Sequence, residues 1–170
     1  MKIIEGLKQI KDLQRKASDI RAKIRECAAK MSFETSKYEN QREKVAGWLQ
    51  SHHDLVLEIE RLRERISKTN VLTTVTIDLC DKSITKTIHS WISRRRDLSA
   101  LDLSAWQQLS DMGLKDQAVR SPSTTEVVEF KVVRFFDPSL RDKKIDALKS
   151  EISIIDAKLE IVNATTDLLD

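Results

Sequence analysis

The adjacent histidines His52-His53 are the first place in the sequence where metal chemistry could occur. Two histidines that bind one metal ion from a single helix are spaced i and i+4, or have cysteines and carboxylates nearby. Adjacent residues on a helix point about 100° apart, so His52 and His53 do not share a face. Because His52 also falls on an apolar helical seam, we interpret it as a polar residue that fixes register or oligomeric state.

Cys27 and Cys80 are the candidate thiol nucleophiles. Cys27 lies on a helical seam, which predicts a buried structural thiol. Cys80 lies near a predicted turn, and no neighbouring His or Asp completes a nucleophile motif. The sequence also has no Gly-rich phosphate loop, HExxH or CxxC motif. We therefore expect no enzymatic activity, no metal and no cofactor.

The triplet Arg94-Arg95-Arg96 raises the question of nucleic-acid binding, which normally needs a concentrated basic surface. Asp97 follows directly and Asp102 lies nearby, so the local charge is small. The 170 residues include 30 Lys+Arg and 27 Asp+Glu, a net charge of only +3, and 5% of them are aromatic. A solvated or salt-bridged face is therefore favoured, and no nucleic-acid partner is expected.

Two long amphipathic helices are predicted in the first 70 residues. Residues 2–31 carry apolar side chains at alternating spacings of four and three, with one extra three-residue step that would overwind a coiled coil. Residues 41–69 keep this spacing without a slip, and Asn40 with Glu43 matches a capping box. Joined by a polar stretch, the two helices predict an α-hairpin. The seam of the second helix consists of Val45, Trp48, His52, Leu55, Ile59, Leu62, Ile66 and Thr69.

The next part of the chain changes its periodicity. Residues 71–80 alternate with period two and are rich in β-branched side chains, which predicts a strand followed by a turn at 81–83. A third helix is expected over residues 84–112, stopped by Gly113, with a break near Ser99 as an alternative.

A second strand and a fourth helix complete the chain. Residues 114–125 show the least pattern, and the alternation over residues 127–136 predicts a strand. Asp137-Pro138 is a strong helix start, because a capping carboxylate precedes a proline at the first helical position. The fourth helix carries the seam Ile145, Leu148, Ile152, Ile155, Leu159 and Val162. Two strands are too few for a free sheet, so we expect them to pair as a ribbon on the helices.

The sequence therefore predicts a mainly α protein: a long antiparallel helical hairpin or coiled-coil bundle with a small two-stranded β ribbon. We expect a single domain over residues 1–170, with the hairpin in 1–70, a strand, helix and strand in 71–136, and the C-terminal helix in 137–170. Charged residues make up 34% of the chain and flank narrow apolar seams. Such helices complete their core with other copies, so a homo-oligomer is expected.

The sequence also indicates a location. No apolar run approaches the roughly 18 to 20 residues that span a bilayer. Residues 1–5 lack the apolar stretch of a signal peptide. Two cysteines do not form a disulfide framework, so a reducing cytoplasm is expected.

The order of motifs resembles a family of small bacterial and phage proteins, many of which carry the name septicolysin. The matching stretches are Leu7-Lys-Gln-Ile-Lys-Asp-Leu13, Ile66-Ser-Lys-Thr-Asn70, Ile84-Thr85 leading into Arg96-Asp97-Leu98, the strand at 127–136, and Asn163-Ala-Thr-Thr-Asp167. The sequence departs from the family pattern at residues 32–44 and at Asp81-Lys82, both in loops. The resemblance implies a helical hairpin core that oligomerises, and it implies no established activity.

Polar residues shared with that pattern lie at helix ends or in mid-helix. Thr69 and Asn70 close the second predicted helix, and Arg96 and Asp97 lie within the third. One interpretation is that these four residues tie the two helices together, because polar side chains near helix ends cap turns. The other is a small polar pocket between subunits.

Three functional hypotheses follow. The first is a non-enzymatic oligomeric helical protein with a structural or interaction role. The second is a septicolysin-like membrane-active protein, although the sequence shows neither an export signal nor a segment that enters lipid. The third is a weak nucleic-acid-binding regulator.

Overall fold

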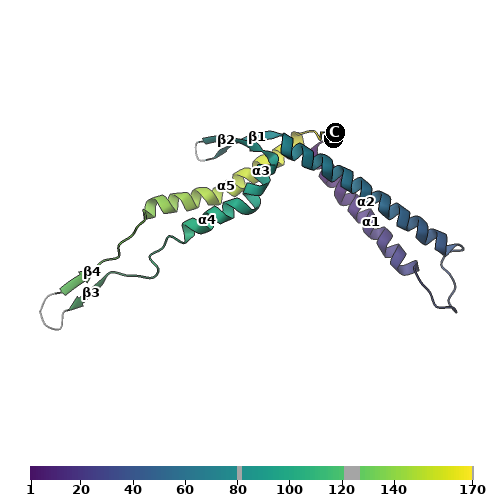
Figure 1. The fold of residues 1–170 in the computed structure, drawn as a ribbon, viewed down its shortest axis with the longest axis horizontal. Helices are drawn as coiled ribbons and strands as arrows, with labels where there is room; N and C mark the ends of the chain where they lie inside the picture. Colours follow the sequence, from purple (N-terminus) through teal and green to yellow (C-terminus); the bar gives the residue numbers. More distant parts are fainter. Residues whose placement is uncertain (80–81, 121–126, 170) are drawn as a thin grey trace. The chain divides into compact units, whose positions relative to one another are not determined.

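The structure is a computed structural model that describes residues 1–79, 82–120 and 127–169 (Figure 1). Cys80, the predicted turn residue Asp81 and residues 121–126 lie outside the described residues. The elements are α1 (Ile3–Cys27), α2 (Gln41–Leu72), β1 (Thr74–Leu79), β2 (Lys82–Thr87), α3 (Ile88–Ser93), a π-helical turn (Arg94–Leu98), α4 (Ser99–Gln107), β3 (Gln117–Arg120), β4 (Val127–Phe130) and α5 (Pro138–Thr165). The predicted mainly α fold class is confirmed.

The sequence predicted one domain, and the contacts within the chain form two compact units. The first unit comprises residues 1–75, 87–89 and 159–170, and the second comprises residues 76–86 and 90–158. The last turns of α5 therefore belong to the first unit, and the rest of that helix belongs to the second.

The first unit is built on the predicted hairpin. Helices α1 and α2 lie side by side (Figure 1). Helix α2 extends to Leu72, three residues beyond its predicted end. Every predicted seam position of α2 is buried or half-buried. The buried apolar residues of this unit are Ile3, Ile10, Leu13, Ala17, Cys27, Ile59, Leu62, Ile66, Ile88, Leu159, Val162 and Leu168.

The end of the chain is joined to its beginning in the first unit. The Ile3 amide donates to the Thr166 carbonyl at 3.0 Å, and the Leu168 amide donates to the Met1 carbonyl at 2.8 Å. Between these two bonds, Lys2 Nζ lies 2.6 Å from Asp167 Oδ2. The hydrogen bond from Lys2 holds the pKa of Asp167 below its ordinary value of 3.8.

Thr69 links the end of α2 to the same terminal segment. Its hydroxyl donates to the Arg65 carbonyl at 2.8 Å and accepts from the Leu169 amide at 2.9 Å. Thr69 is fully buried, so both bonds are shielded from water. Across the unit, a Cβ added at Gly6 would lie 3.0 Å from Leu168 Cδ1, which shows how closely the terminal segment approaches α1.

The second unit differs from the prediction in its strands. Small two-stranded sheets are present, but β1 pairs with β2 and β3 pairs with β4, so the predicted pairing of 71–80 with 127–136 is wrong. The β3–β4 pair is antiparallel, and Val119 is opposite Val128. Strands that are close in the chain lose less loop entropy when they pair, which favours these local partners.

Strand β2 occupies residues where the third helix was expected to begin. The helix starts at Ile88 instead, because Lys82–Thr87 pairs with β1 and the Thr76 and Thr85 hydroxyls lie 2.7 Å apart across the strands. Helix α4 ends at Gln107, before the predicted stop at Gly113, whose φ of 76° places it in a left-handed turn.

The prediction for the start of α5 is confirmed, and the prediction for the start of α2 is confirmed only in its position. Helix α5 begins at Pro138, and the Asp137 carboxylate accepts from the Ser139 amide at 2.8 Å and the Leu140 amide at 3.4 Å. The predicted cap at Asp137 is therefore confirmed. Asn40 does precede α2, but its side chain makes no capping hydrogen bond, so the predicted capping box is wrong in its chemistry.

We expect the seam at Ile59 to be essential for the stability of the first unit. Ile59→Val removes one methyl group and should lower the free energy of unfolding by about 1 kcal/mol, whereas Ile59→Asp buries a charge and should cost more than about 3 kcal/mol. Urea unfolding followed by circular dichroism at a fixed protein concentration measures both. Equal, small losses for the two variants would show that this position is exposed.

The ion pair between Lys2 and Asp167 predicts a pH dependence. A depressed carboxyl pKa stabilises the folded state above the ordinary value of 3.8, and this contribution is lost as the pH falls through the folded-state pKa. Asp167→Asn should therefore lower the melting temperature at pH 7, and the difference from the wild type should shrink as the pH falls below 3.8. A difference that stays constant down to pH 2 would contradict the linkage.

Candidate functional site

The seam of the hairpin is buried unequally along its length. On α2, Ile59, Leu62 and Ile66 are buried, but the seam positions nearer the helix start are only half-buried. Those positions are Val45, Trp48, His52 and Leu55. On α1, Ile20 and Ile24 are likewise half-buried, whereas Ala17 and Cys27 are buried. We call this part of the hairpin, α1 from Lys16 and α2 up to Glu58, the distal half.

The cause of this gradient is the number of elements that share the seam. Leu168, from the terminal segment, approaches α1 at Gly6, where Ile66 of α2 also lies close. Three segments thus meet at that end of the hairpin. In the described part of the first unit, the distal half consists of two helices alone, and two helices cannot enclose a seam from all sides.

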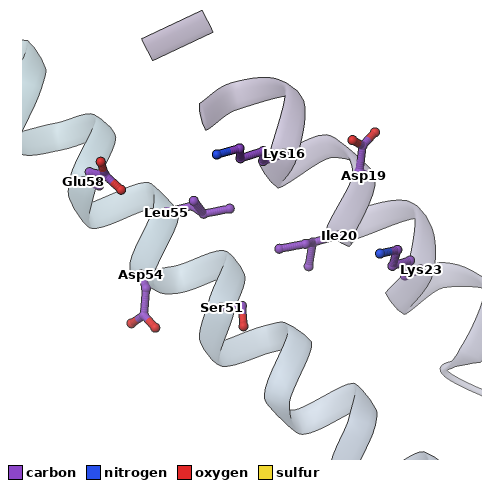
Figure 2. A pocket seen from close by; sticks show the side chains of 8 residues that line it. All are labelled: Lys16, Asp19, Ile20, Lys23, Ser51, Asp54, Leu55 and Glu58. Atoms are coloured by element: carbon purple, nitrogen blue, oxygen red, sulfur yellow. The ribbon is translucent and has the colours of Figure 1, made fainter. Parts of the chain in front are cut away.

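A groove runs between the two helices in the distal half. It has a volume of about 480 Å³ and is lined by Lys16, Asp19, Ile20 and Lys23 from α1 and by Ser51, Asp54, Leu55 and Glu58 from α2. Figure 2 shows Ile20 and Leu55 pointing toward one another across the groove. An apolar floor between charged rims is typical of a helix-binding surface.

His52 lies on the seam beside this groove, where the sequence predicted it. It is half-buried, and His53 is exposed. Among residues 1–79, 82–120 and 127–169, no group of three or more His, Cys, Asp or Glu side chains is arranged to hold a metal ion. The role of His52 in register or oligomeric state stays a prediction.

The adjacent residues Thr69 and Asn70 differ in their hydrogen bonding. Thr69 bonds to the terminal segment as described above. The Asn70 amide oxygen is buried and has no hydrogen-bond partner in the described part of the chain, which costs about 1–3 kcal/mol for a polar atom removed from water. The predicted tie between these residues and the third helix stays a prediction.

The three consecutive arginines are ion-paired, as the salt-bridged interpretation predicted. Arg96 pairs with its neighbour Asp97 at 2.8 Å, and both side chains are exposed. Arg95 lies 2.8 Å from Asp156 on α5. Exposed pairs of this kind contribute at most about 1 kcal/mol, so Arg96 and Asp97 are a surface pair with little effect on stability.

The sequence did not predict the cluster around Arg94, in which Glu151 and Ser99 are buried. Arg94 Nε donates to Glu151 Oε1 at 2.6 Å, and its guanidinium also donates to Asp102. Ser99, which is fully buried, donates to the same Glu151 oxygen at 3.0 Å. The hydrogen bond to Glu151 raises the pKa of Arg94 above its ordinary value. Glu151 interrupts the apolar face of α5, and this interruption was the available signal.

The Arg94 cluster joins three elements of the second unit. Arg94 begins the π-helical turn, Asp102 and Ser99 belong to α4, and Glu151 belongs to α5. A cavity of about 270 Å³ adjoins it, with walls from Leu79, Trp106, Lys144, Ala147 and Leu148. Because the two carboxylates are already used by Arg94, the cluster acts as a structural link in this unit.

Comparison with known proteins identifies the family of the chain. Residues 10–168 match a family described as a family of unknown function, DUF6847. The chain belongs to this family. A crystal structure of a functionally unknown conserved protein from Corynebacterium diphtheriae is similar over 99% of both chains, with a TM-score of 0.59 and 21% identity. At this identity the likeness shows the fold alone. No curated protein matches the chain.

These comparisons correct the sequence-based resemblance in part. The DUF6847 family and the similar structure are both described as having unknown function, and neither carries the name septicolysin. Within the described ranges, no helix of this DUF6847 protein combines the length and the apolar character needed to cross a bilayer.

We expect Arg94 and Arg96 to differ sharply when each is replaced by Met. Arg94→Met leaves the buried Glu151 carboxylate without its cation and should lower the free energy of unfolding by about 2–4 kcal/mol. Arg96→Met removes only an exposed pair and should change it by less than about 0.5 kcal/mol. Thermal unfolding of the two variants gives the comparison, and equal losses would contradict the buried role of Arg94.

Proposed function

We propose that this protein is a non-enzymatic structural or interaction protein that self-associates through the distal half of its α1–α2 hairpin. The observation that carries the proposal is the half-buried distal seam of α2, which continues without a break from the buried part of the same helix. A continuous apolar seam that loses its cover within one chain is completed by a further helical surface.

The exposed surface supports this proposal. The chain exposes 12743 Å². Two globular domains of half its mass, taken separately, would together expose about 10,000 Å². The chain as a whole therefore encloses less of its surface than two average domains of that mass would. Association is the usual way for such a chain to bury more apolar area.

The non-enzymatic role is supported at the Arg94 cluster and the Arg96–Asp97 pair, where the polar side chains are paired with one another. The carboxylates of the Arg94 cluster are held in ion pairs, and the exposed Arg96 is paired with Asp97. A catalytic site needs polar groups that are free to meet a substrate. We also propose a cytoplasmic location, on the same cysteine argument as above; Cys27 is a free, buried thiol.

A membrane-active role is the second candidate, and one observation favours it. The β3–β4 pair and the segment after it expose apolar side chains, with Phe130 58%, Val133 72% and Phe135 97% exposed. Exposed aromatic and aliphatic residues can enter a lipid interface. Release of dye from anionic vesicles would favour this role; intact vesicles between pH 5 and 8 would exclude it. The third hypothesis, nucleic-acid binding, gains nothing from the ion-paired arginines.

Self-association should depend on Leu55 and not on its neighbour Val56. Leu55 lines the groove, while Val56 is 44% exposed and does not line it. Leu55→Asp should yield the 19.6 kDa monomer in light scattering at micromolar concentration, and Val56→Asp should keep the mass of the wild type.

Circular dichroism is the control, since both variants should keep the helix content of the wild type. The proposal fails if the wild type itself has a mass of 19.6 kDa at this concentration. It fails equally if both Asp variants dissociate to the same extent.

A further inference from the structure

The two rims of the groove carry opposite charge. The α1 rim contributes Lys16, Asp19 and Lys23, a net positive charge. The α2 rim contributes Asp54 and Glu58 and no basic side chain. Figure 2 shows the ammonium ends of both lysines directed to the α2 side of the groove. The charge along the groove therefore differs between its two sides: it is net positive on the α1 side and negative on the α2 side.

The charges on the two rims are not neutralised by ion pairs with each other within one hairpin. Asp54 accepts a hydrogen bond from Gln50 at 2.8 Å, and Glu58 accepts one from Gln9 at 3.1 Å. Both donors are neutral amides. In the described part of the chain, no salt bridge within 4 Å joins Lys16 or Lys23 to either carboxylate. The rims thus offer unneutralised charge of opposite sign beside an uncovered apolar floor.

We infer that the groove is occupied by the same hairpin of a second copy, with α1 of each copy facing α2 of the other. This inference rests on the proposed self-association and adds its partner orientation. In a two-fold dimer, each contact occurs twice. Placing α1 against α2 of the partner brings lysines to carboxylates at both contacts. Placing α1 against α1 brings Lys16 and Lys23 near the same lysines of the second copy, so the like charges repel one another.

The apolar floor fits the same arrangement. Ile20 and Leu55 are half-buried within one chain, so each has surface left for a partner. Two hairpins pairing in this way make a four-helix bundle, in which seam residues fill the centre and flanking charges choose the neighbour. The flanking charges set the orientation, and the seam supplies most of the association energy.

Charge reversal on each rim tests the orientation. One variant carries Lys16→Glu and Lys23→Glu, and the other carries Asp54→Lys and Glu58→Lys. Each variant alone places like charges at both contacts and should associate at least about tenfold more weakly than the wild type. An equimolar mixture of the two should form a mixed dimer of wild-type strength, because both contacts are then complementary. Native mass spectrometry identifies the mixed species.

The mixture separates contacts between chains from effects inside one chain. Each variant keeps like charges on its own two helices, so recovery on mixing arises only between copies. Lys8→Glu with Lys11→Glu is the matched control, since it makes the same charge change outside the groove and should associate like the wild type.

The outcomes are distinguishable. If the wild type associates and the mixture stays monomeric, the α1-to-α2 orientation is wrong while self-association stands. If each variant alone associates like the wild type and the mixture binds more tightly than the wild type, α1 faces α1. If the variants and their mixture all associate like the wild type, charge does not set the orientation. A monomeric wild type overturns both the orientation and the proposed function.

Discussion

The contact of the terminal segment with the start of α1 and the end of α2 determines how the first unit is built. Leu168 lies against Gly6 of α1, and the Leu169 amide donates to Thr69 of α2. These contacts give the hairpin its third packing partner, and the buried seam residues of α2 lie at the end where that partner is present. A hydroxyl that bonds on both sides in a fully buried place cannot be replaced by water. A third segment therefore packs on the hairpin at this end.

The other end of the hairpin follows from the same constraint. Helices α1 and α2 continue past the terminal segment with the same 3-4 spacing and the same flanking charges, but without a third element from the described part of the first unit. Burial falls from Ile59, which is buried, to Leu55, which is half-buried, within one turn of the helix. The sequence does not change its character at this point, and only the number of neighbours changes. The apolar pattern of α2 therefore continues over positions that the chain itself covers only in part. This supports the proposal that a partner covers them.

Sequence reasoning succeeded where the signal is local and repeated. The seams are set by side-chain period, and the start of α5 is set by Asp137 and the proline after it. Strand pairing failed because it depends on which segments meet, and Lys82–Thr87 has a single large apolar residue, Ile84, that also fits a helical spacing. The Arg94 cluster was missed for a similar reason. The partners Arg94 and Glu151 are 57 residues apart, so no local pattern joins them.

The charged side chains of this protein have different roles, and the role of each pair depends on how far the pair is buried. The Arg96–Asp97 pair is in water and contributes little, whereas Arg94 and Glu151 are withdrawn from water and depend on each other. The groove lies between these extremes. Its lysines and carboxylates are exposed in one chain, but they flank an apolar floor that a partner would cover. Covering that floor removes water around the charges and strengthens their interaction. Charges that stabilise nothing in the single chain can thus select the orientation in the pair.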